Sequence, residues 1–365
     1  MTEEVARHPK FYLPEGDCVF RIEATLFRVH RFILSRDSSA FEDMFSMPTG
    51  SVGQELPKEG YSDDRPIVLE GEVASDFEAL LAVLYALPAE LHELTSNPAN
   101  VSQLLTVAEM ANKYHFVTTT AWAISALCAV TECPTEPPRA ERAPHSPLEC
   151  AWASPPILRR LIEVALLCGH KQLCDHAVEK WVQLIQDGFE NPVAAMGVAD
   201  EHGLARLAGV AYYETLLGCD GDLAYTWAPP DENAPATTHT PALSQRVRLL
   251  RGFFALVRRW ETLRGAPPPF ARPEGCTYHA HGCLSTWAAT WRAAARSDGL
   301  VHRPAADVLG RLRAMRELLD ADRDLRLALT PACRRAAMES VHELCEREED
   351  GLAVHFRDLT ASGEA

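Results

Sequence analysis

The residues best suited to chemistry are cysteines and histidines in a proline- and glycine-rich segment, Cys276-Thr-Tyr-His-Ala-His-Gly-Cys283. Zinc in proteins is bound by cysteine thiolates and histidine imidazoles, with four ligands in a structural site. A complete site here would need Cys276, Cys283 and one of His279 or His281, with Cys333 as a further ligand. These five residues are the candidates for a metal site.

The same segment also fits a purely structural role. Six residues separate its two cysteines, which is not a zinc-finger spacing, and the sequence contains no Cys-x2-Cys pair. The alternative is a loop whose cysteines pack under Trp287 and Trp291. We therefore predict no cofactor, and zinc bound by this segment is the alternative.

A second set of possible ligands comprises Cys168, His170, Cys174 and His176. These residues lie on both sides of an expected turn between two helices, and Cys174 borders the apolar stripe of the second helix. Packing in a helical core explains them more simply than a metal does.

Catalytic motifs are missing from the sequence. It contains no Gly-x-Ser-x-Gly elbow, no Gly-x4-Gly-Lys-Ser/Thr loop and no His-Glu-x2-His helix. Nucleophilic catalysis also needs an activated serine or cysteine beside a base, and no such arrangement is indicated. The sequence predicts that the protein is not an enzyme.

Charge and hydropathy narrow the class of partner. The 365 residues carry a net charge of −16, divided into −19 over residues 1–240 and +3 over residues 241–365. An acidic surface repels phosphates, so we expect no nucleic-acid partner.

No apolar run approaches the roughly 20 residues of a membrane span, and the charged N-terminus does not resemble a secretory signal. We expect a cytoplasmic or nuclear protein whose eleven cysteines are reduced thiols.

The first hundred residues predict a small sheet with helices. Alternating apolar residues over 17–23 and a second run over 26–29 indicate a half-buried hairpin. Two short helices follow, the second with Asp37, Ser38 and Ser39 available to cap it. After a long loop, the sequence predicts a strand over 67–69 and a helix that is capped by Ser75 or Asp76 and stopped by Pro88.

The sequence of the rest of the chain predicts helices, the first of them in antiparallel pairs. Three hairpins are expected over 104–127, 161–185 and 193–217, with turns at 114–116, 168–170 and 202–204. Gly169 and Gly203 lie where a helix end favours a positive φ angle. Four more helices are expected over 243–263, 283–296, 305–319 and 331–349.

The order of these elements and several short motifs resemble a BTB/POZ domain over residues 11–130. The motifs are Asp17-Cys-Val, Phe27-Arg-Val-His-Arg-Phe-Ile-Leu34, Ser39-Ala-Phe-Glu-Asp-Met-Phe45 and Ile67-Val-Leu69. Their style is similar to that of the BTB proteins abundant in basidiomycete, mushroom-forming fungi, in which an all-helical region also follows the domain. The fold class expected is therefore α+β, a small β-sheet flanked by helices, followed by an all-α region of helical hairpins.

The resemblance also implies roles for single residues. Asp17 and Arg31 match the Asp and Arg that form a charged pocket near the family's dimer interface, where a buried carboxylate needs a nearby cation. The residues that match the structural motif are His30, Leu34, Ser39, Phe41, Met44 and Phe45.

The expected domain organisation has six parts. They are an N-terminal tail (1–10), the BTB domain (11–130), a proline-rich linker (131–156), a BACK-like helical-hairpin region (157–227), a second linker (228–242) and an Arg- and Trp-rich helical region (243–365).

Two functions follow from the resemblance. The first is a protein-interaction scaffold that homodimerises through the BTB domain and holds an unknown protein partner with its helices. The alternative is a substrate adaptor for a cullin-family ubiquitin ligase. The hydrophobic-x-Glu element of many cullin-binding BTB domains has no clean counterpart between residues 46 and 59.

Overall fold

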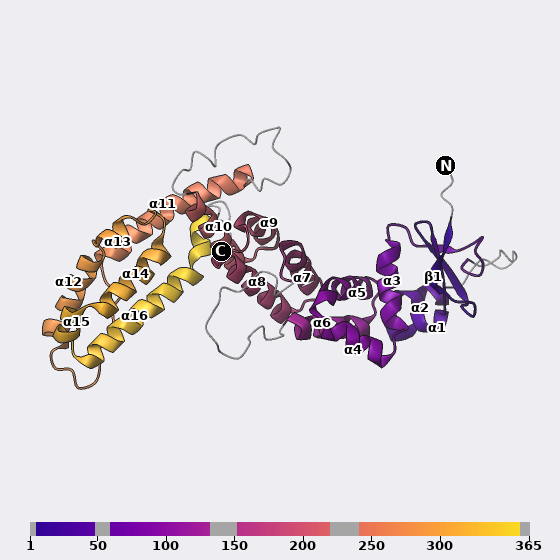
Figure 1. Cartoon of the computed structure of the whole chain (residues 1–365), viewed down its shortest axis with the longest axis horizontal. Helices are drawn as coiled ribbons and strands as arrows, with labels where there is room; N and C mark the ends of the chain where they lie inside the picture. The colour runs from indigo at the N-terminus through magenta and orange to yellow at the C-terminus, as the bar shows by residue number, and fades with distance from the viewer. Residues whose placement is uncertain (1–4, 48–58, 132–151, 220–240, 358–365) are drawn as a thin grey trace. The chain divides into compact units, whose positions relative to one another are not determined.

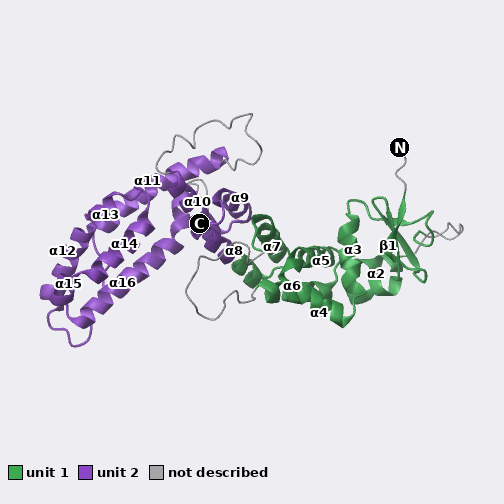
Figure 2. Ribbon diagram, in the orientation of Figure 1, with its two compact units in different colours: residues 1–177 green, residues 178–365 purple. Residues whose placement is uncertain are grey.

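The computed structural model describes residues 5–47, 59–131, 152–219 and 241–357. The chain divides into two compact units, residues 1–177 and 178–365, coloured separately in Figure 2. The division falls inside helix α8 (Lys171–Gln186). The expected linkers fall largely on residues 132–151 and 220–240, which lie outside the described residues, so the predicted domain boundaries stay predictions.

Unit 1 begins with a four-stranded mixed sheet of order β1-β3-β2-β4 (Figure 1). Its strands are β1 (Ala6–Tyr12), β2 (Cys18–Ile22), β3 (Thr25–Val29) and β4 (Ile67–Val68). The predicted hairpin is confirmed, because β2 and β3 pair antiparallel with Cys18 opposite Val29. β1 runs parallel to β3, and β4 runs parallel to β2.

Strand β1 lies mostly within residues 1–10, for which the sequence predicts an N-terminal tail. Residues 6–10 belong to this strand, which pairs with β3 and places His8 and Phe11 in the interior. The strand lacks the alternating pattern of a half-buried strand, and its burial repeats every third residue. It also contains Pro9, which is tolerated because β1 lies at the edge of the sheet.

The helices of unit 1 follow the predicted hairpins. They are α1 (Arg31–Leu34), α2 (Ala40–Ser46), α3 (Ala74–Leu84), α4 (Pro88–Ser96), α5 (Val101–Lys113), α6 (Val117–Thr131), α7 (Pro155–Leu167) and the first part of α8. The turns at 114–116 and 168–170 are confirmed, and Gly169 has the expected positive φ of 66°. Pro88 begins α4, because a proline at the first helical position forfeits no internal hydrogen bond.

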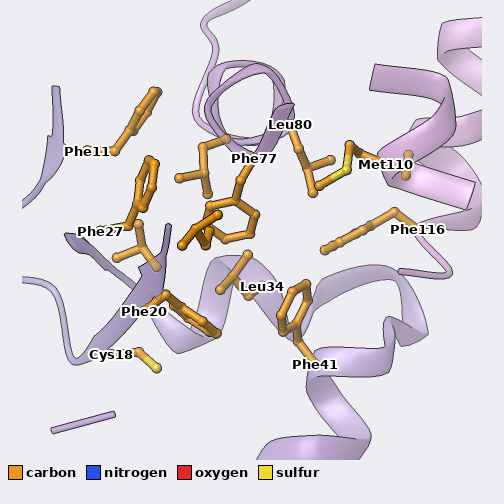
Figure 3. Packing of buried hydrophobic residues seen from close by; sticks show 14 residues of the cluster. Phe11, Cys18, Phe20, Phe27, Leu34, Phe41, Phe77, Leu80, Met110 and Phe116 are labelled. Carbon is orange, nitrogen blue, oxygen red and sulfur yellow. The ribbon is translucent and has the colours of Figure 1, made fainter. Parts of the chain in front are cut away.

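An aromatic cluster forms the core of this unit between the sheet and the helices (Figure 3). Phe41 belongs to this cluster and is 2 % exposed. Its ring stacks on Tyr114 at 4.6 Å between centroids and meets the rings of Phe20 and Phe77 at 5.7 and 6.4 Å. These contacts join strand β2 to helices α2, α3 and the end of α5.

Two helices of unit 1 are capped by carboxylates far away in the sequence. The Asp37 carboxylate accepts hydrogen bonds from the backbone N–H of Thr118 at 2.6 Å and from its hydroxyl at 2.8 Å, at the start of α6. Glu23 accepts from the backbone N–H of Ala74 at 3.0 Å, at the start of α3. Ser39 is the N-cap residue of α2, as the sequence offered, but its side chain makes no capping hydrogen bond. The predicted cap of α3 was wrong, because Ser75 and Asp76 lie inside the helix and the distant Glu23 bonds its first N–H.

Asp37 also has a φ of 66°, a left-handed conformation that aspartate and asparagine adopt more readily than alanine does. We predict that Asp37→Ala lowers the free energy of unfolding of unit 1 by about 1–2 kcal/mol, the cost of losing a helix cap. Asp37→Asn should lower the free energy of unfolding less than Asp37→Ala does, because asparagine tolerates this backbone conformation and can accept the same hydrogen bonds. Urea denaturation of the two variants measures the difference, and equal losses would contradict a capping role.

Unit 2 consists of helices. After the second part of α8 come α9 (Pro192–His202), α10 (Ala205–Gly218), α11 (Leu243–Gly265), α12 (Leu284–Ala294), α13 (Asp298–Val301), α14 (Val308–Ala321), α15 (Arg323–Ala328), α16 (Pro331–Asp350) and a 3-10 segment, Leu352–Phe356. The four predicted long helices are confirmed to within a few residues, and Pro331 begins α16 as expected. The turn at 202–204 is also confirmed, with Gly203 at a φ of 66°. Within the described parts of the chain, no helix has the length and apolar character needed to cross a bilayer.

Candidate functional site

Asp17 and Arg31 lie together at the start of helix α1. The backbone N–H of Arg31 donates to a carboxylate oxygen of Asp17 at 2.7 Å, and the Arg31 Nε donates to the Asp17 carbonyl at 3.4 Å. Asp17 therefore satisfies a backbone donor that the first turn of the helix leaves unpaired.

The environment of this pair differs from the expected buried pocket. Asp17 is exposed in the chain, so its carboxylate does not depend on a neighbouring cation. The guanidinium of Arg31 lies over the rings of Phe45 and Tyr61, 4.8 and 4.5 Å from their centroids. Cation–π attraction stabilises this position. The two residues form part of an open surface in this chain.

Beneath this surface, Cys18 is fully buried. Burial raises the pKa of the Cys18 thiol to about 12, which outweighs the opposing effect of Arg31. The thiol is therefore protonated near neutral pH and is not an activated nucleophile.

The other motif residues of the resemblance lie in or against the core. The backbone N–H of His30 donates to the Tyr85 hydroxyl at 2.8 Å, and the His30 Nδ1 lies 3.1 Å from the same oxygen. The hydroxyl of Ser39 is buried and donates to the carbonyl of Leu34. Leu34 and Phe41 belong to the buried cluster, and Met44 and Phe45 pack against it. Each of these contacts is structural.

Comparison with known proteins identifies the family to which this fold belongs. Residues 13–124 match the family model of the BTB/POZ domain. This part of the chain is a BTB/POZ domain. The match lies within the residues 11–130 that the sequence motifs indicated. BTB domains are protein–protein interaction modules without enzymatic activity of their own. No curated protein and no solved structure matches the chain.

The BTB domain exposes apolar side chains beside Arg31. Phe32, the next residue of α1, is 75 % exposed, and Tyr61 is 58 % exposed with Arg31 over its ring. We call Asp17, Arg31, Phe32 and Tyr61 the Arg31 surface. Sequence reasoning missed Phe32 and Tyr61. The available signal was that Phe32 is apolar but lies outside the helical stripe formed by Ile33 and Leu34.

Three of the metal-site candidates meet in unit 2. The Sγ atoms of Cys276, Cys283 and Cys333 all lie within 4.8 Å of one another, and all three residues are buried. His279 is also buried and lies against Cys333, whereas His281 is exposed. A hydrogen bond from Thr330 lowers the pKa of Cys276, and burial raises the pKa of Cys333 to about 11.

The second set of possible ligands does not gather in this way. Among the residues that the structure describes, Cys276, Cys283 and Cys333 are the only group placed to hold a metal. The Nδ1 of His170 accepts from the backbone N–H of Leu173 at 3.1 Å. The Nε2 of His176 lies 3.2 Å from the carbonyl of Thr131.

Proposed function

We propose that the protein is an interaction scaffold that associates with a second copy of itself through the Arg31 surface, while its helical region holds another protein. The observation that carries this proposal is the exposure of Phe32 beside the cation–π pair of Arg31 and Tyr61. The proposal places the protein in the cytoplasm or nucleus, and its likeness in style to fungal BTB proteins supports the same scaffold role.

The composition of the Arg31 surface suits a protein interface. Aromatic residues and arginine are enriched at protein interfaces. Aromatic side chains bury a large area while fixing only two rotatable bonds. Arg31 is already oriented by Phe45 and Tyr61, so less conformational freedom is lost on association. Asp17 supplies an acidic group next to this cation, so when the same patch of two copies faces itself, each Arg31 can meet the Asp17 of the other copy.

Light scattering on the purified full chain tests this self-association. We predict a mass above that of the 40.3 kDa chain for the wild type, and a mass that falls towards the single chain for Phe32→Ser. The double variant Asp17→Leu with Arg31→Met should weaken association as well, with the fold retained. Leu87→Ser is the matched control, because Leu87 is 66 % exposed but precedes α4. A monomeric wild type, or equal effects of Phe32→Ser and Leu87→Ser, would contradict the proposal.

The alternative function is a substrate adaptor for a cullin-family ubiquitin ligase. It rests on the BTB domain alone, because the cullin-binding element of such domains would lie between residues 46 and 59, and residues 48–58 lie outside the described residues. Affinity purification of the tagged full chain, beside a chain lacking residues 11–130, separates the two functions. A cullin that is recovered only with the BTB domain present would establish the adaptor function, and its absence would favour the scaffold.

A further inference from the structure

Three cysteines that are distant in the sequence converge in the interior of unit 2. The Sγ atoms of Cys276 and Cys333, 57 residues apart, lie 3.5 Å from each other. Cys283 completes the trio, in which all Sγ–Sγ distances are at most 4.8 Å. The exposed fractions of Cys276, Cys283 and Cys333 are 5 %, 0 % and 0 %. Such a group is sealed from solvent.

A histidine extends this trio. The Nδ1 of His279 lies 3.4 Å from the Sγ of Cys333, and the residue is only 7 % exposed. Its ring meets Phe270 edge to face at 5.1 Å, and Phe270 meets Trp287 at 6.3 Å. The aromatic residues therefore orient the imidazole and keep water from that side of the group.

The backbone around these residues is built to bring them together. His279 to Cys283 form a single π-helical turn before α12, a geometry that is rare and often marks a functional site. Cys333 lies in the first turn of α16, where its backbone N–H donates to the Thr330 hydroxyl at 3.3 Å, so the start of a regular helix fixes its position.

Outer contacts hold the ligand-bearing loop. The Thr330 hydroxyl lies 3.7 Å from the Sγ of Cys276 and donates to it, and the Nε of Arg272 donates to the Cys276 carbonyl at 2.7 Å. Ligands of structural metals are typically supported by hydrogen bonds of this kind.

We propose that Cys276, Cys283 and Cys333 bind one Zn²⁺ through their thiolates. The Nδ1 of His279 lies 3.4 Å from the Sγ of Cys333 but not within 4.8 Å of all three sulfur atoms, so His279 becomes the fourth ligand by moving towards the trio when the metal binds. In a tetrahedral site with Zn–S bonds of about 2.3 Å, neighbouring sulfur atoms lie about 3.8 Å apart. The Cys276–Cys333 sulfur separation of 3.5 Å is close to this value, and the other sulfur separations are at most 4.8 Å. Four protein ligands leave no open position, so the zinc is structural and joins the loop before α12 to the start of α16.

A disulfide between Cys276 and Cys333 is the main competing arrangement. It requires the sulfur atoms to approach to about 2.05 Å and gives no role to Cys283 or His279. In the zinc site, by contrast, all four residues are ligands. Soft thiolate ligands together with an imidazole also disfavour calcium and magnesium, which bind oxygen.

Metal analysis of the full chain, purified under reducing conditions, tests the proposal without any substitution. We expect about one zinc per chain. After chelation, Co²⁺ should bind with the same stoichiometry and give intense visible bands of tetrahedral cobalt with thiolate-to-metal charge transfer. A wild-type chain that holds no zinc and takes up no cobalt would overturn the proposal, as would a Cys276–Cys333 disulfide in the freshly purified protein.

Matched variants assign the ligands. Cys333→Ser should lose the bound metal, whereas Cys345→Ser, at a buried cysteine of the same helix α16, should keep it. His279→Gln should bind cobalt at least about tenfold more weakly, whereas His281→Gln, which changes an exposed imidazole two residues away, should bind as the wild type does. Equal losses in Cys333→Ser and Cys345→Ser, or retention of the metal by both, would overturn the assignment.

Discussion

Replacement of Phe41 by alanine should lower the free energy of unfolding of the BTB domain by about 3–5 kcal/mol. The ring is 2 % exposed and contacts aromatic residues from a strand and several helices, including Phe20, Phe77 and Tyr114. A strand and several helices cannot all move inward to fill the space that the ring leaves, so a cavity should remain. Domains of ordinary stability have only about 5–15 kcal/mol in total, so the variant should be close to unfolding.

The exposed Phe32 provides the matched control for this substitution. Phe32→Ala removes the same ring from a side chain that is 75 % exposed, so the stability should change by no more than about 0.5 kcal/mol. Hydrogen exchange measured on peptides from β2 and β3 reports the stability, and light scattering reports the association. We expect Phe41→Ala to speed up the hydrogen exchange and Phe32→Ala to weaken the association. Unchanged exchange in Phe41→Ala would contradict the packing of this ring in the core.

Periodicity in the sequence was sufficient to predict most helices and the hairpin of the sheet. The stripe of Phe77, Leu80 and Leu81 repeats at the helical period, and Gly203 marks a turn through its lack of a side chain. Such signals are local, because each residue's place depends on neighbours within one or two turns. The BTB resemblance added the order in which these elements assemble.

The features that were missed depend on contacts between distant segments. β1 owes its existence to pairing with β3, and Asp37 caps a helix that begins 80 residues later. In unit 2, the sequence left His279 and His281 as equal alternatives, since both lie between the same two cysteines. The π-helical turn distinguishes them, because it buries His279 beside Cys333 and exposes His281. No pattern of residue types predicts that turn.

The same kind of distant contact explains why a glycine occupies the middle of α11. A Cβ atom at Gly252 would overlap the ring of Phe356, which is 3 % exposed and stacks on Tyr212 at 5.3 Å. In a solvent-exposed helix, alanine is more favourable than glycine by about 1 kcal/mol. At Gly252 the overlap should reverse the sign, because the ring can make room only by leaving its buried place.

We therefore predict that Gly252→Ala lowers the free energy of unfolding of unit 2 by about 1–3 kcal/mol, in the range of an overpacked core. Gly197→Ala is the matched control, because a Cβ at this exposed position of α9 meets no atom within 4 Å. It should raise stability by up to about 1 kcal/mol. Phe356→Leu should recover part of the loss when it is combined with Gly252→Ala, because the smaller side chain leaves room for the added methyl group. Thermal unfolding of the four variants measures these effects, and additive losses in the double variant would show that Gly252 and Phe356 do not constrain each other.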